Sequence, residues 1–140
     1  MAEIFKIKIP GNPEYIQIAK MAIGSASAIE GFDLERIEDI KIAVAEACKI
    51  VTCHGSPGWS DSYEVCCTRK GASIVINVTD FEGTHGVKKT AKRPCLDCSR
   101  EGDLSLQVIK SLMDEVEIVP MGKGYKSIIM VKNYAEQRVK

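Results

Sequence analysis

The chain has 140 residues, of which 45% are hydrophobic, and its nineteen basic residues balance nineteen acidic ones. This length supports one core of ordinary size and not two, so we expect a single domain over residues 1–140. A chain without net charge has no long-range field that would attract nucleic acid. No apolar run approaches the length of a membrane span, and the N-terminus alternates polar and apolar residues. We therefore expect a cytoplasmic protein with no nucleic-acid or membrane partner.

Hydrophobic periodicity predicts a strand and two helices in the first part of the chain. Alternating polar and apolar residues at 6–9 predict the strand. A helix is expected from Pro13, a residue that favours the first helical position, to Gly31, a residue that favours a helix end. Asp33 is a suitable N-cap for a second helix, which extends to about Cys53.

The remaining chain predicts two hairpins with a third helix between them. The hairpins are expected at residues 63–79 and 116–132, and the helix at residues 104–113. The polar stretch 80–103 has no periodicity and is expected to be a long loop that is either functional or mobile. These elements predict an α+β two-layer sandwich, in which a mostly antiparallel mixed sheet carries helices on one face.

The second predicted helix places a carboxylate beside its buried face. Glu46, Ile50 and His54 recur every four residues and share one helix face. The neighbouring face carries an apolar stripe made of Ile37, Ile40, Val44, Ala47 and Val51. Two interpretations of Glu46 follow from this position. It is either a solvated charge or a general base whose proton affinity is tuned by partial burial.

Three segments, at residues 9–15, 37–48 and 111–118, resemble in the same order the anti-sigma-factor serine kinases of the RsbW and SpoIIAB type. The resemblance covers nearly the whole chain and implies the Bergerat ATP-binding fold of the GHKL superfamily. It also implies ATP and magnesium as cofactors, a sigma factor and a STAS-type antagonist as partners, and a homodimer. In the family's helix motif, Glu46 stands at the catalytic base and His54 matches. Ile50 stands where the family has a magnesium-binding asparagine.

A second candidate nucleotide-binding motif lies at the end of a predicted strand. A carboxylate such as Asp80, followed by Gly83 and Gly86, can accept a hydrogen bond from an exocyclic amine while the backbone approaches a ligand. An ordinary aspartate turn explains the same residues. The resemblance implies that Asp80 binds adenine, although the first family glycine is displaced by one residue, to Gly83.

A third motif precedes the last predicted helix. Glycine loops that lead into helices bind phosphate because backbone amides are exposed there. The family glycines correspond to Asp103 and Ser105, and Gly102 is the nearest glycine that remains. Asp103 is equally well explained as a helix N-cap. These departures, together with Ile50, argue against efficient catalysis.

Cys95 and Cys98 are two residues apart in the predicted loop, a spacing that can hold a metal ion or form a reducible bridge. A zinc site needs four ligands, and the candidates to complete it are Cys53, His54, Cys66, Cys67 and His85. The alternative is that the six cysteines are reduced thiols, with Cys48 and either Cys66 or Cys67 packed as small hydrophobic side chains.

Two hypotheses remain open. In the first, the protein is an ATP-dependent serine kinase that binds a sigma factor and phosphorylates a STAS-type antagonist. In the second, it is a catalytically inactive partner-switching module on the same fold, controlled by thiol or metal state. The two differ in whether Glu46 has magnesium and a γ-phosphate to act on.

Overall fold

The computed structural model describes residues 2–11, 13–51, 62–80, 96–122 and 125–134. Its strands form a five-stranded sheet in the order β1-β2-β3-β5-β4, in which every neighbouring pair is antiparallel. The strands are β1 (Ala2–Pro10), β2 (Ser62–Lys70), β3 (Ser73–Asp80), β4 (Glu115–Gly122) and β5 (Tyr125–Asn133). Both predicted hairpins are confirmed. The first turns at Gly71, whose φ of 60° suits glycine.

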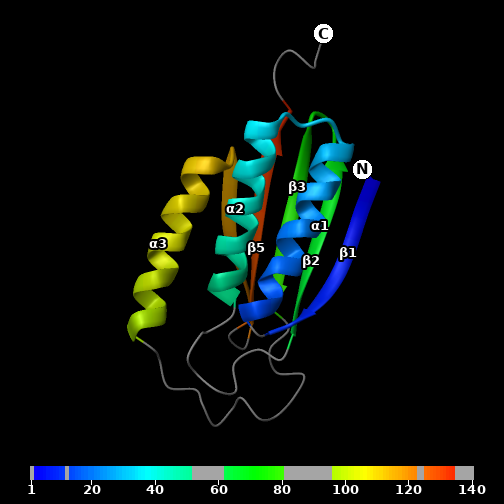
Figure 1. Ribbon diagram of the computed structural model, residues 1–140. Helices are drawn as coiled ribbons and strands as arrows, with labels where there is room; N and C mark the ends of the chain where they lie inside the picture. The colour runs from blue at the N-terminus through cyan, green and yellow to red at the C-terminus, as the bar shows by residue number, and fades with distance from the viewer. Residues whose placement is uncertain (1, 12, 52–61, 81–95, 123–124, 135–140) are drawn as a thin grey trace.

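The helices of the described chain cover one face of this sheet, which confirms the α+β two-layer sandwich (Figure 1). They are α1 (Ile16–Ile29), α2 (Leu34–Val51) and α3 (Leu96–Leu112), and α1 follows a 3-10 turn, η1 (Pro13–Tyr15). In the middle of the layer, α2 contacts both α1 and α3. None of the described helices is long and apolar enough to cross a membrane.

The core lies between the helices and the sheet. Along β2, Tyr63, Val65 and Cys67 are fully buried, while the residues between them are partly exposed. This alternation is the period of a strand with one covered face. On the helix side of the core, α2 contributes Ile40, Val44 and Ala47, which are also fully buried. The predicted apolar stripe is therefore confirmed at these three positions, and Ile37 packs at its margin.

The turn between α1 and α2 forms as predicted. Gly31 has a φ of 91°, and the Phe32 amide donates to the Ser27 carbonyl at 3.1 Å, which closes the end of α1. Asp33 then caps α2, because its Oδ1 accepts the Arg36 amide at 2.9 Å. This short turn makes α1 and α2 antiparallel neighbours.

The third helix corrects the predicted loop. It begins at Leu96 and not at residue 104, so residues 96–103 are helical. Gly102 and Asp103 consequently lie inside α3, and Asp103 is not its N-cap. Apolar periodicity marks only the part of a helix that has a buried stripe. Arg100 and Glu101 are good helix formers that extend the helix without such a stripe.

Candidate functional site

The structure brings together two of the predicted site residues, Glu46 on α2 and Ser105 on α3. The Ser105 hydroxyl donates a hydrogen bond to Glu46 Oε1, with the two oxygens 2.6 Å apart. The other carboxylate oxygen, Oε2, pairs with Lys49 Nζ at 3.1 Å. The Glu46 side chain is 19% exposed, so it borders the buried stripe as its position in the sequence predicted.

The two contacts of Glu46 differ in strength. The Lys49 side chain is 52% exposed, and ion pairs in such a setting contribute about 0–1 kcal/mol. Ser105 is 5% exposed, and a hydrogen bond from a neutral donor to a charged group contributes roughly 1.5–3 kcal/mol. The hydrogen bond from Ser105 is therefore the stronger of the two contacts.

Helix periodicity explains why Ser105 reaches α2. Ser105, Ile109 and Met113 follow one another at intervals of four residues and are all buried, so they lie along one side of α3 and its C-terminal end. Ile109 and Met113 belong to the core. The hydroxyl of Ser105 continues this buried stripe and meets Glu46 where the stripe faces α2.

A buried lysine fixes the other end of α3. Lys132 on β5 is 8% exposed, and its Nζ donates to the Leu112 carbonyl at the end of α3. The same nitrogen lies 3.6 Å from Asp39 Oδ2 on α2. A cation at a helix C-terminus is favourable because the last carbonyls have no partner within the helix. Contacts at Ser105 and Leu112 thus hold α3 against α2 and the sheet.

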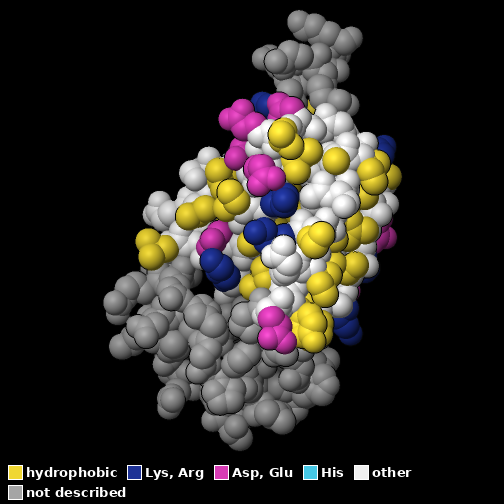
Figure 2. Space-filling view, in the orientation of Figure 1, with side chains coloured by type: hydrophobic (Ala, Val, Ile, Leu, Met, Phe, Trp, Pro, Cys, Tyr) yellow, Lys and Arg dark blue, Asp and Glu magenta, His cyan; other side chains and the backbone are white. Residues whose placement is uncertain are grey.

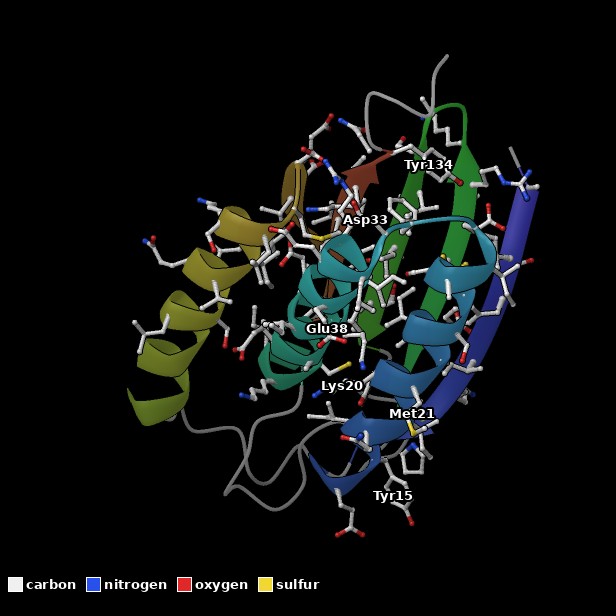
Figure 3. The ribbon with its side chains drawn as sticks, turned by 45° about the horizontal axis from the view of Figure 1, so that its top comes forward. Tyr15, Lys20, Met21, Asp33, Glu38 and Tyr134 are labelled. Carbon is white, nitrogen blue, oxygen red and sulfur yellow. The ribbon has the colours of Figure 1, made fainter. Side chains whose placement is uncertain are left out.

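A pocket opens beside Glu46 on the solvent side of the helices. Its volume is about 470 Å³, and residues of η1, α1 and α2 line it: Glu14, Ile16, Gln17, Lys20, Ile42, Ala45, Glu46 and Lys49. Figure 3 shows Lys20 at the junction of α1 with α2. Figure 2 shows acidic and basic side chains gathered over α2, and apolar side chains over α1. The pocket therefore combines two cations, Lys20 and Lys49, with two carboxylates, Glu14 and Glu46.

Lys20 and Lys49 are site residues that the sequence analysis missed. For Lys49 a signal exists in the sequence, because it follows Glu46 by three residues on a helix and can pair with it. For Lys20 no such signal exists, since its position beside Glu46 results from the packing of α1 on α2.

Ile50 lies one helix turn after Glu46 and packs against the core as a half-buried side chain. Its side chain has no oxygen or nitrogen. Magnesium in proteins takes oxygen ligands, so this position does not fit a magnesium ion, although the resemblance implies one there.

Several predicted site residues fall outside what the structure describes. His54, Gly83, Gly86 and Cys95 lie beyond the described ranges. Asp80 ends β3 opposite Tyr63, as its predicted place at a strand end requires, but its side chain is not described. Their roles stay predictions.

The metal alternative gains no support from the described side chains. Gly102 and Cys98 lie within α3, and the side chains of residues 96–103 are not described. Among the described residues there is no group of three or more side chains that could hold a metal ion. The pairing of Cys95 with Cys98 as zinc ligands or as a bridge stays a prediction.

Cys48 and Cys67 are buried hydrophobic packing residues, which confirms that part of the cysteine analysis. Burial raises the pKa of each thiol to about 12. Burial also raises the pKa of Tyr63, whose ring lies beneath α2 and whose hydroxyl faces the Cys48 thiol. Cys66 lies on the other face of β2, where it is half-exposed. The region beneath α2 is consequently dry and apolar.

Comparisons with known proteins agree with this geometry. The sequence model of the histidine kinase-like ATPase domain matches residues 9–132. The serine-protein kinase RsbW of Bacillus pumilus is 32% identical, over 98% of this chain and 90% of its own length. RsbW of Listeria monocytogenes is 28% identical, over 99% of this chain and 92% of its own length.

Two solved structures share the fold. The RsbU and RsbW domains of a Mycobacterium tuberculosis protein align with a TM-score of 0.66 at 16% identity, covering 94% of this chain and 33% of that one. The SiaB–SiaC complex of Pseudomonas aeruginosa aligns with a TM-score of 0.62 at 13% identity, covering 93% of this chain and 89% of that one. The fold is therefore that of histidine kinase-like ATPases. Within that class, the chain belongs to the RsbW-type family of anti-sigma-factor serine kinases.

Proposed function

We propose that the protein is an anti-sigma-type regulator that binds a sigma factor and a STAS-domain antagonist, with residues 1–140 as one histidine kinase-like domain. The observation that carries the proposal is the match to relatives named serine-protein kinase RsbW, at up to 32% identity over nearly the full length. The retained Glu46, one of the residues that carry the resemblance, stands at the centre of the described site. A cytoplasmic location and a homodimer belong to the same proposal.

Glu46 has the position that a general base needs for kinase chemistry. When a serine hydroxyl attacks the γ-phosphate of ATP, a carboxylate within hydrogen-bond distance receives the serine proton. The Glu46 carboxylate is partly exposed beside the pocket that Lys20 and Lys49 also line. The two lysines are balanced there by Glu14 and Glu46, so the pocket offers counter-charges to groups of either sign on a partner's segment. We propose that the antagonist's serine-bearing segment enters here.

The same site favours partner exchange over turnover. Ile50 offers no ligand to magnesium, and Ser105 occupies one oxygen of Glu46. The inactive partner-switching module is therefore the second candidate, and Ile50 is the observation that favours it. Under this proposal ATP can still bind, but its use as a phosphate donor is inefficient.

Affinity purification from the native cell tests the proposed partners. Tagged protein, purified under reducing conditions with and without ATP, is expected to recover a sigma factor or a STAS-domain protein. Lys20→Glu reverses a charge in the pocket and should lower recovery of the antagonist, whereas Lys70→Glu, at the end of β2, should not. Recovery of neither partner class under either condition would show that the fold serves an unrelated use.

A further inference from the structure

We infer that Ser105 is an internal competitor for the catalytic carboxylate: its hydroxyl takes the place at Glu46 that the hydroxyl of a substrate serine must occupy. The inference rests on the proposed function, because it concerns the residue proposed as general base. It adds a role for Ser105 that is neither nucleotide binding nor simple packing. Ser105 becomes the residue that restrains phosphoryl transfer in this chain.

The contact has the geometry of a general base and the hydroxyl group whose proton it takes. A general base must lie about 2.6–3.2 Å from the hydroxyl oxygen whose proton it takes. Ser105 Oγ lies 2.6 Å from Glu46 Oε1, with the serine as donor. A serine hydroxyl has one hydrogen to donate, and here that hydrogen is directed at Glu46. A substrate serine would make the same contact with the same oxygen.

The second oxygen of Glu46 does not remove the competition. Oε2 pairs with Lys49, whose side chain is 52% exposed and free to exchange with solvent. A substrate hydroxyl at Oε2 would share that oxygen with this cation, since a carboxylate oxygen accepts two hydrogen bonds. Lys49 and Ser105 each take one acceptor site of Glu46, and Ser105 is the less easily displaced because it is almost completely buried.

The fold keeps Ser105 at the contact. Ile109 and Met113 anchor the same side of α3 in the core, and Lys132 holds the Leu112 carbonyl at its end. With the helix anchored in this way, the backbone of Ser105 stays beside Glu46, and its hydroxyl can leave the carboxylate only by rotation about its own χ1. A hydroxyl group held within the same molecule as the carboxylate has a high effective concentration at that carboxylate. A partner's serine competes at a disadvantage for this reason.

Competition and simple structural support predict opposite effects of removing the hydroxyl on phosphoryl transfer, whereas both allow the carboxylate to become more accessible. If the hydrogen bond only positions α3, Ser105→Ala loosens the helix and cannot improve the site. If Ser105 competes for Glu46, Ser105→Ala frees Oε1 and improves its access. Ser111→Ala is the matched control, since Ser111 lies on the same helix and its hydroxyl bonds to the Val108 carbonyl at 2.7 Å.

The first measurement needs no nucleotide or partner. Carbodiimide activation followed by coupling to glycinamide labels accessible carboxylates, and mass spectrometry gives the labelling rate at Glu46. Ser105→Ala is expected to raise this rate about tenfold, the factor by which losing one hydrogen bond to a charged group changes an equilibrium. Ser111→Ala should leave the rate unchanged. An equal rate in the Ser105→Ala and native chains would overturn the inference.

The second measurement uses phosphate release from Mg-ATP in an Ile50→Asn background, where an oxygen ligand for magnesium is supplied. Water is then the acceptor: its oxygen bonds to the γ-phosphorus, the bond to ADP breaks, and Glu46 receives the water proton. Adding Ser105→Ala should raise the rate about tenfold over Ile50→Asn alone, and adding Ser111→Ala should not.

An unchanged or lower rate, or no phosphate release from the Ser105→Ala double variant, would contradict the inhibitory role. Calorimetric titration of that variant with Mg-ATP separates the two kinds of failure. Binding without an increased rate contradicts only the role of Ser105. Absence of binding contradicts the proposed nucleotide function as well.

Discussion

The Tyr63 hydroxyl is a buried polar group with no nitrogen or oxygen partner in the described part of the chain. It faces the Cys48 thiol, and sulfur is a weak hydrogen-bond partner. Burying a hydroxyl without a good partner costs about 1–3 kcal/mol. The tyrosine ring, in contrast, fills the core beneath α2, where it is fully buried.

Tyr63→Phe is therefore expected to leave the free energy of unfolding unchanged or to raise it by up to about 1 kcal/mol. Tyr63→Ala, which leaves a cavity in place of the ring, should lower it by about 3–5 kcal/mol. Urea unfolding of both variants measures these differences. A loss of more than about 1 kcal/mol in Tyr63→Phe would mean that the hydroxyl has a strong partner.

The buried thiols make stability fall at alkaline pH. In the folded protein the pKa of Cys48 and that of Cys67 are each about 12, against an ordinary value of 9.0. A raised pKa means that the folded state holds its proton more tightly. The stabilisation is therefore complete below pH 9 and is lost as the pH rises toward 12, by about 1.4 kcal/mol per pH unit for each thiol.

Urea unfolding at pH values from 7 to 10.5 tests this dependence. The native chain is expected to lose stability steadily above pH 9, and Cys48→Ala should show a shallower slope because one ionisable thiol is gone. Cys66→Ala should flatten the slope less, because burial also raises the pKa of this thiol but its side chain is half-exposed. Equal slopes in the native and Cys48→Ala chains would contradict the burial of Cys48.

Helix α2 carries the candidate base, and its first turn depends on Asp33. Asp33→Ala removes the side-chain oxygen that accepts the Arg36 amide, and the expected loss in the free energy of unfolding is about 1 kcal/mol. Asp33→Asn keeps an N-cap oxygen while removing the exposed ion pair with Arg36, so it should cost only a few tenths of a kcal/mol. Thermal or urea unfolding distinguishes the two. Similar losses in both variants would assign the effect to the ion pair.

Periodicity in the sequence was enough to predict most elements. The stripe of α2, the Gly31 helix end and both hairpins follow from local patterns, because each has one covered face or a turn residue of its own. The start of α3 does not, because residues 96–103 lack an apolar stripe. The local pattern also could not show that Ser105 faces Glu46, since the two residues are 59 positions apart in the sequence.

The layered architecture explains why the site was only partly predictable. Glu46 contacts Ser105 and lines a pocket with Lys20 because α2 lies between α3 and α1 on the same face of the sheet. Each residue is recognisable on its own element, but the order of the helices sets their distances. Resemblance to a family predicted the residues Glu46 and Ser105, while the hydrogen bond between them is particular to how these two helices pack.

The arrangement of the described residues supports a regulator in which the candidate base, Glu46, is kept, while position 50 offers magnesium no ligand. Glu46 is retained and partly exposed beside a charged pocket. Ile50, one turn away, packs against the core. A domain of this kind can bind partners with its helices and sheet intact while turning over nucleotide poorly.

Calorimetric titration with ATP, in the presence of magnesium and in the presence of a chelator, tests this combination. For the native chain, magnesium is expected to change the affinity by no more than about threefold, because Ile50 offers it no oxygen. For Ile50→Asn, magnesium should tighten binding by about tenfold or more. A micromolar affinity of the native chain for ATP that depends on magnesium would contradict the claim that position 50 excludes a magnesium site.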